Sequence, residues 1–172
     1  LNAQAGTATA IEPSTAIAEA TGLLNNDRTN SHKVNVGNVS GTIVATSKDA
    51  LGEINLGASG IRNQSGSLTA QGTDLTVSAV GYGGQRNIIN ATAIENGGTN
   101  ITITGKTKFN VTANVDSGNM TQVIAIATGV EERSSVKGDS AILGDVEGQV
   151  KVLVSGSGQQ VMGGAMGIDI AS

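Results

Sequence analysis

The sequence has very few of the residues that usually build a cross-linked or aromatic-rich core. Its 172 residues contain no cysteine, no tryptophan, one phenylalanine, one tyrosine and one proline. The absence of cysteine excludes a disulfide framework and a thiolate metal site. An ordinary globular core would lack its usual large side chains. We therefore expect a core of Val, Ile, Leu and Ala.

Charged residues and long apolar runs are also scarce. Only 14% of the residues are charged, and the net charge is −4. A mildly acidic chain without a basic cluster does not suit nucleic acid or an anionic membrane as a partner. No apolar run approaches the roughly 20 residues of a membrane helix, so we expect no membrane insertion. The chain starts without a signal peptide and its last predicted strand lacks a cap, as expected for a piece of a longer protein.

What the sequence does contain is an internal repeat. Residues 68–72 align with 101–105 at a shift of 33. Residues 75–80 align with 109–115 at a shift of 34 through most of the strand, and residues 88–93 align with 122–127 at that same shift. Each copy has three short runs of alternating apolar and polar residues. Similar runs occur at 34–41, 42–46 and 53–61, and again at 141–148, 150–154 and 165–171. Short strands repeated at such a period are typical of a stacked solenoid.

The repeat predicts one all-β domain over residues 1–172, a parallel β-helix of about four rungs of roughly 33 to 41 residues each. We expect Leu75 to stack on Phe109, and Val77 on Val111 and Val152. A shared joint between first and second strands is predicted at Gly41, Gly72, Gly105 and Gly148, where a corner without a Cβ is needed. The sequence does not indicate which face of the third strand points inward, because its runs are apolar on both faces.

Residues 1–33 depart from this pattern. We interpret them as a partial rung followed by an excursion from the coil. Ala and Glu favour a short helix over residues 15–22, which Ser14 would cap. A polar loop over residues 25–33 would return the chain to the coil.

Three strand ends share the phrase Ala-x-Ala-Ile or Ala-x-Gly-Ile, at residues 58–61, 91–94 and 165–168, and the run ITITGKTKFNVTANV follows at 101–115. In this repeat style, residues 34–172 resemble the β-helical passenger regions of bacterial autotransporters (type V secreted proteins) and related large surface adhesins. The resemblance implies a right-handed parallel β-helix on the bacterial outer-membrane surface or outside the cell. It also implies a role in adhesion, self-association and virulence. Trimeric autotransporter heads repeat a related phrase, but at a shorter period.

Catalytic chemistry has one candidate in the sequence. Alternation places Asp145 and Glu147 on one strand face, as acid/base cleavage of a polysaccharide would require. Sugar-stacking aromatic residues are nearly absent, and charged residues outside a core are usually just solvated. His32 is the only histidine and has no Ser/Asp pattern around it. We therefore expect no enzymatic activity, no cofactor and no metal.

Specific contacts of a solenoid are expected in its loops, because the coil holds their bases in place. The predicted partners are surface molecules of host or neighbouring cells, or another copy of the chain. Two loops are candidates, although each also reads as an ordinary solvated loop, and a passive spacer remains an alternative. Their predicted contact residues are Tyr82, Glu131, Glu132, Arg133 and Lys137.

Overall fold

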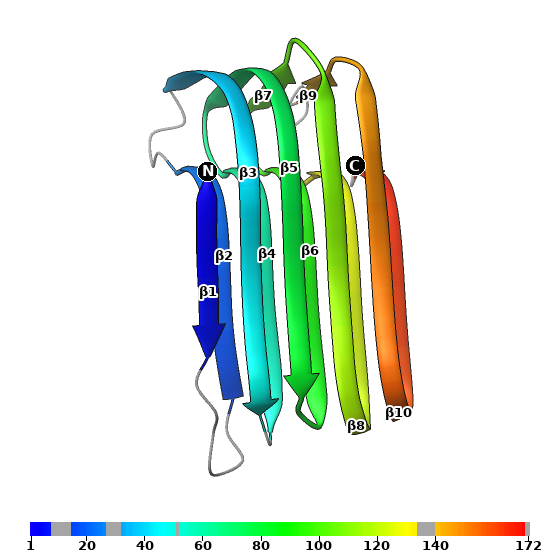
Figure 1. The fold of residues 1–172 in the computed structure, drawn as a ribbon. Coiled ribbons are helices and arrows are strands. Elements are labelled where there is room, and N and C mark those ends of the chain that lie inside the picture. Colours follow the sequence, from blue (N-terminus) through cyan, green and yellow to red (C-terminus); the bar gives the residue numbers. More distant parts are fainter. Residues whose placement is uncertain (8–14, 27–31, 51, 134–139, 171–172) are drawn as a thin grey trace.

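The computed structural model describes residues 1–7, 15–26, 32–50, 52–133 and 140–170, which form an all-β solenoid (Figure 1). These ranges contain no helix, and thus none that is long and apolar enough to cross a membrane. The strands are β1 (Asn2–Thr7), β2 (Thr15–Asn25), β3 (Lys33–Ala50), β4 (Glu53–Asn63), β5 (Ser67–Gly83), β6 (Arg86–Asn96), β7 (Asn100–Ile103), β8 (Thr107–Glu132), β9 (Ser140–Leu143) and β10 (Val146–Ile170).

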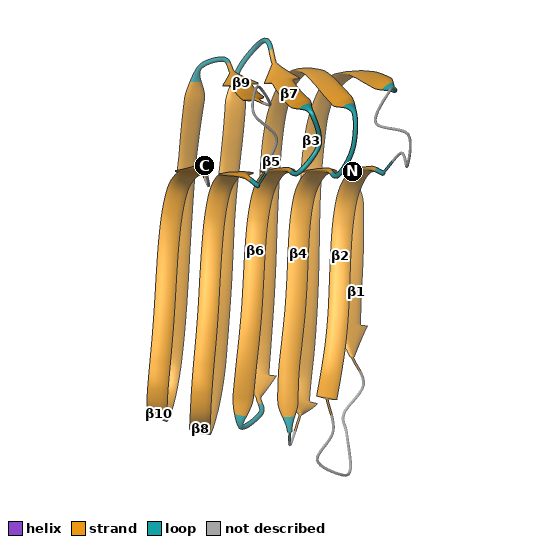
Figure 2. Cartoon of the chain, turned by 180° about the vertical axis from the view of Figure 1, so that it is seen from behind, coloured by secondary structure: helices purple, strands orange, loops and turns teal. Residues whose placement is uncertain are grey.

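Two long layers of parallel strands face each other across the core (Figures 1 and 2). The front layer of Figure 1 contains β1, β3, β5 and the first halves of β8 and β10. The back layer contains β2, β4, β6 and the second halves of β8 and β10. β7 and β9 form a short third side with the starts of β3 and β5. The chain thus coils through about four turns, preceded by β1 and β2.

The length of each turn agrees with the sequence prediction. On the short third side, Lys33, Ser67, Asn100 and Ser140 pair in succession and thus mark the same position of consecutive turns. The differences between their residue numbers give turns of 34, 33 and 40 residues. In the front layer Leu75 pairs with Phe109, and Val77 with Val111, as predicted. The parallel solenoid and its period are therefore confirmed.

Two predicted alignments are wrong. Val111 pairs with Val150, whereas Val152 pairs with Ala113. Valines at alternate positions offer several equivalent registers, and only the length of the preceding corner selects one. In the back layer Ile88 pairs with Ile124, a shift of 36 and not 34. The turn inside β8 is two residues longer than the link between β5 and β6, since Tyr82 still pairs with Asp116 at a shift of 34.

Of the four glycines predicted to share one corner between first and second strands, two lie there and two do not. Gly72 and Gly105 lie at the corner, where a Cβ on Gly105 would overlap the carbonyl oxygen of Gln71. The next glycine of this corner is Gly144, because a Cβ there would overlap the carbonyl oxygen of Gly105. Gly41 instead pairs with Leu75 of the following turn, and Gly148 pairs with Phe109 of the preceding turn. The Phe109 ring lies against Gly148 and occupies the space where a side chain would be.

The core consists of stacked aliphatic columns. Ile43, Val77 and Val111 form one fully buried column of the front layer, and alanines form the next column along the strands, at 45, 79 and 113. Aliphatic side chains that stack on their own kind from turn to turn fill a thin core without aromatic residues.

A bend in each back-layer strand explains the Ala-x-Gly/Ala-apolar phrase. The phrase occurs in all five stacked strand segments, at residues 20–23, 58–61, 91–94, 127–130 and 165–168. In β4 the buried residues alternate up to Ala58, but Gly60 and Ile61 are then both buried and the alternation shifts by one. A Cβ on Gly60 would point at the Leu75 and Val77 side chains of the opposite layer. The third strand therefore has one inward face before the bend and the other after it.

The predicted helix over residues 15–22 is wrong. Residues 15–25 form β2, which pairs in parallel with β4. Ala16, Ala18 and Ala20 are buried at alternate positions, and the residues between them face outward. Pairing with β4 and burial of this alanine row override the helix propensity of alanine. The proposed cap at Ser14 lies outside the described residues.

We expect Gly60→Ala to lower the free energy of unfolding by about 1–3 kcal/mol, as overpacking of a core does. The added Cβ would lie 2.5 Å from the carbonyl oxygen of Ala93 and 3.0 Å from Leu75 Cδ1. Gly57→Ala in the same strand is the matched control, because its Cβ would contact only Glu19 Cγ, at 3.6 Å. Denaturant unfolding followed by circular dichroism measures both. Equal losses would contradict a steric constraint at the bend.

Candidate functional site

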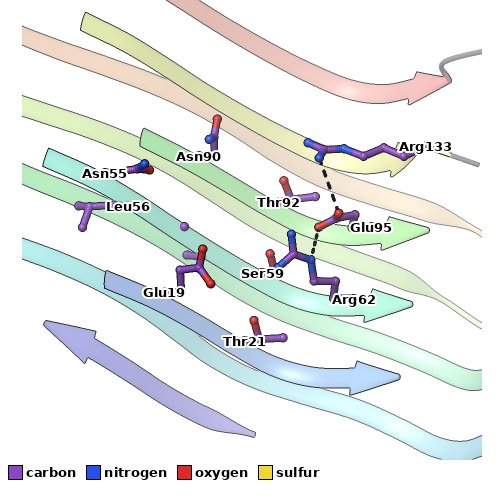
Figure 3. A pocket seen from close by; sticks show the side chains of 12 residues that line it. Glu19, Thr21, Asn55, Leu56, Ser59, Arg62, Asn90, Thr92, Glu95 and Arg133 are labelled. Carbon is purple, nitrogen blue, oxygen red and sulfur yellow. Dashed lines mark ion pairs between the residues drawn. The ribbon is translucent and has the colours of Figure 1, made fainter. Parts of the chain in front are cut away.

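The bend creates a groove on the outer face of the back layer (Figure 3). The groove crosses β2, β4 and β6 and is bounded by the residue that follows β8. Ser59 and Thr92 face this groove yet are less than a tenth exposed, because the strands curve around them. Its polar and charged lining side chains are Glu19, Thr21, Asn55, Ser59, Arg62, Asn90, Thr92, Glu95 and Arg133.

Ion pairs join adjacent turns at one end of the groove (Figure 3). Arg62 Nε lies 2.9 Å from Glu95 Oε2, an ion pair without hydrogen-bond geometry, and Arg133 Nη1 lies 3.8 Å from Glu95 Oε1. Glu95 is only 8% exposed, so these two cations offset the cost of burying its carboxylate. The arginine side chains are 30% and 55% exposed and remain accessible to a ligand.

Arg133 is also held by its neighbour Glu131. Its Nε donates a hydrogen bond of 2.6 Å to Glu131 Oε1. This bond raises the pKa of Arg133 above its ordinary value, while partial burial opposes the rise and the charges of Glu131, Glu95 and Asp169 add to it. The guanidinium is therefore a permanent positive charge at the edge of the groove.

The floor of the groove is a column of hydroxyl side chains. Thr21, Ser59 and Thr92 pair in register from β2 to β6, so their spacing is about 4.8 Å. Amide side chains of β4 and β6 lie beside this column, at Asn55 and Asn90 (Figure 3). Donors and acceptors repeated at such intervals suit an extended polar ligand with hydroxyl, amide or carboxylate groups.

A buried ladder of side chains supports the groove from inside the coil. Asn25 Nδ2 donates to Asn63 Oδ1 at 2.7 Å, and Asn63 Nδ2 donates to Asn96 Oδ1 at 2.6 Å. Asn96 Nδ2 donates to Glu132 Oε2 at 2.8 Å, which completes the ladder. All four side chains are 7% exposed or less. Asn63, Asn96 and Glu132 directly follow the outward-facing Arg62, Glu95 and Glu131 in the sequence. By holding the inward-facing residues in place, the ladder therefore also fixes the positions of these charged neighbours.

The structure places the predicted contact residues in different environments. Arg133 lines the groove and Glu131 binds it, whereas the Glu132 side chain is buried at the end of the ladder. Tyr82 is 37% exposed near the link between β5 and β6. The length of β6, roughly 30 Å, separates that link from the ion pairs, so the two predicted contact regions do not meet. Lys137 lies outside the described residues.

Of the candidate catalytic carboxylates, Glu147 is on the front layer and Asp145 lies in the corner between β9 and β10. Glu147 is exposed and lies 3.5 Å from Lys108 Nζ, in a column that also contains Asp74. These three side chains line a shallow depression that Asp145 does not line. Asp145 is exposed, and its backbone carbonyl accepts a hydrogen bond of 2.8 Å from the Thr107 amide. In the described part of the chain, no group of three or more His, Asp or Glu side chains is placed to hold a metal ion.

Sequence reasoning missed the buried ladder and the groove. A signal for the ladder was present, because Asn25, Asn63 and Asn96 each stand two positions after the last residue of the Ala-x-Gly/Ala-apolar phrase. Such asparagines resemble ordinary turn residues in sequence. Only the shift in alternation at the bend shows that they face inward.

We expect Asn63→Ala to lower the free energy of unfolding by about 2–4 kcal/mol, because it leaves buried groups of Asn25 and Asn96 without their ladder bonds. Asn90→Ala, at an exposed position of the neighbouring strand, is the control and should change stability by about 0.5 kcal/mol or less. Glu132→Gln should retain most of the stability, because the amide oxygen still accepts from Asn96. Denaturant unfolding measures all three. A loss for Asn63→Ala no larger than that for Asn90→Ala would show that the ladder is not a stabilising element.

No protein-family model matches the chain, and the comparisons with curated proteins and with solved structures give no match.

Proposed function

We propose that this chain is a non-enzymatic β-solenoid module that mediates adhesion or self-association, either secreted or displayed on the bacterial outer-membrane surface. The groove of the back layer carries the proposal, because hydroxyl, amide and charged side chains from successive turns line one continuous outer surface. The proposed partners are polar surface molecules of host cells or neighbouring cells. The resemblance to autotransporter passengers and surface adhesins supports the proposed location.

The physical basis of such contact is the addition of weak bonds. A single hydrogen bond at an exposed surface contributes only about 0.5–1.5 kcal/mol net. Groups repeated from turn to turn allow one extended ligand to make several such bonds. Many copies on one surface then raise the effective affinity through avidity. Arg133 adds a charge that a ligand carboxylate would pair with.

Two alternatives predict different outcomes. A polysaccharide-cleaving enzyme would release products from glycans and would lose this activity when Asp145 or Glu147 is replaced by Ala. A passive spacer would neither attach to cells nor cause them to clump. Incubation of the chain with a panel of glycans tests the first alternative, and the attachment assay described next tests the second.

We expect cells that display this chain to attach to host cells or to clump, and Asn90→Ala with Arg133→Ala to reduce attachment about tenfold, equivalent to roughly 1.4 kcal/mol. These two side chains line the groove and are exposed. The matched control is Asn110→Ala with Lys151→Ala, an exposed amide and an exposed cation on the front layer. Cell counts after washing measure attachment, and surface labelling shows that display is equal.

The outcomes separate the proposed contact sites. An equal reduction in the control would contradict the groove as the site. Tyr82→Ala and Lys137→Ala test the two loops without altering the groove or the ladder, and attachment that survives both changes would exclude the loops. If cells displaying the unaltered chain neither attach nor clump, the spacer alternative is supported.

A further inference from the structure

The buried ladder contains a chemically reactive pair of residues in the middle of the coil. Asn96 is followed by Gly97, and this is the only Asn-Gly dipeptide in the sequence. Asparagine before glycine is the dipeptide most prone to deamidation, because glycine has no Cβ to hinder its backbone nitrogen from approaching the asparagine side chain. The other ladder residues are followed by Asn26, Gln64 and Arg133, whose side chains do hinder that approach.

Deamidation of Asn96 is an intramolecular reaction that needs only water. The backbone nitrogen of Gly97 attacks Cγ of Asn96, the Cγ–Nδ2 bond breaks, and Nδ2 leaves as ammonia with the proton that the Gly97 nitrogen loses. Water then opens the five-membered succinimide ring. Attack of water at Cγ gives aspartate, whereas attack at the main-chain carbonyl carbon gives isoaspartate, in which the main chain runs through Cβ and Cγ.

The folded coil restrains both groups that have to react. The Gly97 backbone amide donates a hydrogen bond of 2.7 Å to the carbonyl oxygen of Asn63. Asn96 Oδ1 accepts from Asn63 Nδ2 at 2.6 Å, and Asn96 Nδ2 donates to Glu132 Oε2 at 2.8 Å. The Asn96 side chain is fully buried. Attack by the Gly97 nitrogen therefore requires these bonds to break first.

The neighbouring turns reinforce this restraint. The Gln64 amide donates to the carbonyl oxygen of Asn25 at 2.8 Å, and the Arg133 amide donates to the carbonyl oxygen of Asn96 at 2.7 Å. Asn96 also pairs in register with Asn63 of β4 and with Glu132 of β8. Freeing Asn96 thus means separating the ends of three adjacent strands, which is an opening of the fold and not the movement of one side chain.

Neither product of the reaction fits the ladder. Aspartate at position 96 has no amide hydrogen to donate to Glu132, and it would place two carboxylates together where the native side chains are 0% and 7% exposed. Like charges in a buried site repel each other strongly. Isoaspartate lengthens the main chain at this position and would disturb the register of β6 against β4 and β8.

We propose that Asn96 is a deamidation site which the folded coil closes and which unfolding opens. Reaction in the unfolded chain removes the donor that Glu132 needs, so a converted chain does not rebuild the coil. The site is therefore a one-way switch that makes prolonged unfolding irreversible. This proposal does not depend on the function proposed above, because the ladder is inside the coil and the groove is outside.

Kinetics of conversion test the proposal on the unaltered chain. The purified protein is held at mildly alkaline pH, either folded or in urea, and peptide mass spectrometry measures deamidation at Asn96. We expect the folded chain to react about a hundredfold more slowly or less, because only the opened fraction of molecules reacts. The fraction that refolds on dilution from urea, followed by circular dichroism, should fall as conversion at Asn96 rises.

Gly97→Ala is the matched control for these kinetics. The added Cβ would lie 3.8 Å from the carbonyl oxygen of Asn63, an ordinary contact, so the ladder is retained. This variant should deamidate more slowly in urea and keep its capacity to refold for longer. Equal rates of conversion in the folded and unfolded chain would overturn the proposal. So would loss of refolding at the same rate in Gly97→Ala.

Two further variants test the effect of the product directly. Asn96→Asp should lower the urea midpoint of unfolding by about 1 M or more. Adding Glu132→Gln should recover most of this loss, because the carboxylate then accepts from Asn63 and from the introduced amide, and the ladder again contains one charge. Asn90→Asp, at an exposed position of β6, is the control and should leave the midpoint nearly unchanged.

The comparison of these variants holds even where one of them does not fold. If Asn96→Asp alone fails to fold, recovery of the folded circular dichroism spectrum by Glu132→Gln supports the proposal. A midpoint that Asn96→Asp does not lower, or a double variant no more stable than the single one, would overturn it.

Discussion

Parallel pairing of the backbone, in register from one turn to the next, is the constraint on which the rest of this structure depends. It stacks equivalent positions of successive turns at a spacing of about 4.8 Å, so the side chains of each column must be compatible with their neighbours above and below. Aliphatic side chains such as Ile43, Val77 and Val111 meet this condition as one fully buried column. Polar columns must either hydrogen-bond along the axis or have their charges paired by neighbouring side chains. The ladder from Asn25 to Glu132 and the ion pairs of Glu95 meet these two conditions.

The bend at the Ala-x-Gly/Ala-apolar phrase links the inside of the coil to its outer surface. Glycine or alanine is required there because the opposite layer is close, as the contacts of a Cβ on Gly60 with Leu75 and Val77 indicate. The shift in alternation after the bend turns Asn63 and Asn96 into the core and leaves Arg62 and Glu95 outside. A small residue at one position therefore determines the buried ladder and the polar groove together.

The sides and the ends of the coil differ in chemistry. The sides carry hydroxyl, amide and charged groups in repeated columns, which suit contact with polar surface molecules. The ends carry unpaired strand edges and most of the exposed apolar side chains of the described residues.

The sequence by itself determined the solenoid, its period and the front-layer pairing of Leu75 with Phe109, because alternation and repeat length are local properties of the chain. Only the tertiary structure decided that residues 15–25 form β2, since pairing with β4 outweighs helix propensity. It also set the shift of 36 in the back layer and the choice of Val150 over Val152, because corner lengths select among equivalent registers. The groove and the ladder depend on the bend, where one residue reverses which side chains face inward. Alternation alone contains no information on that reversal.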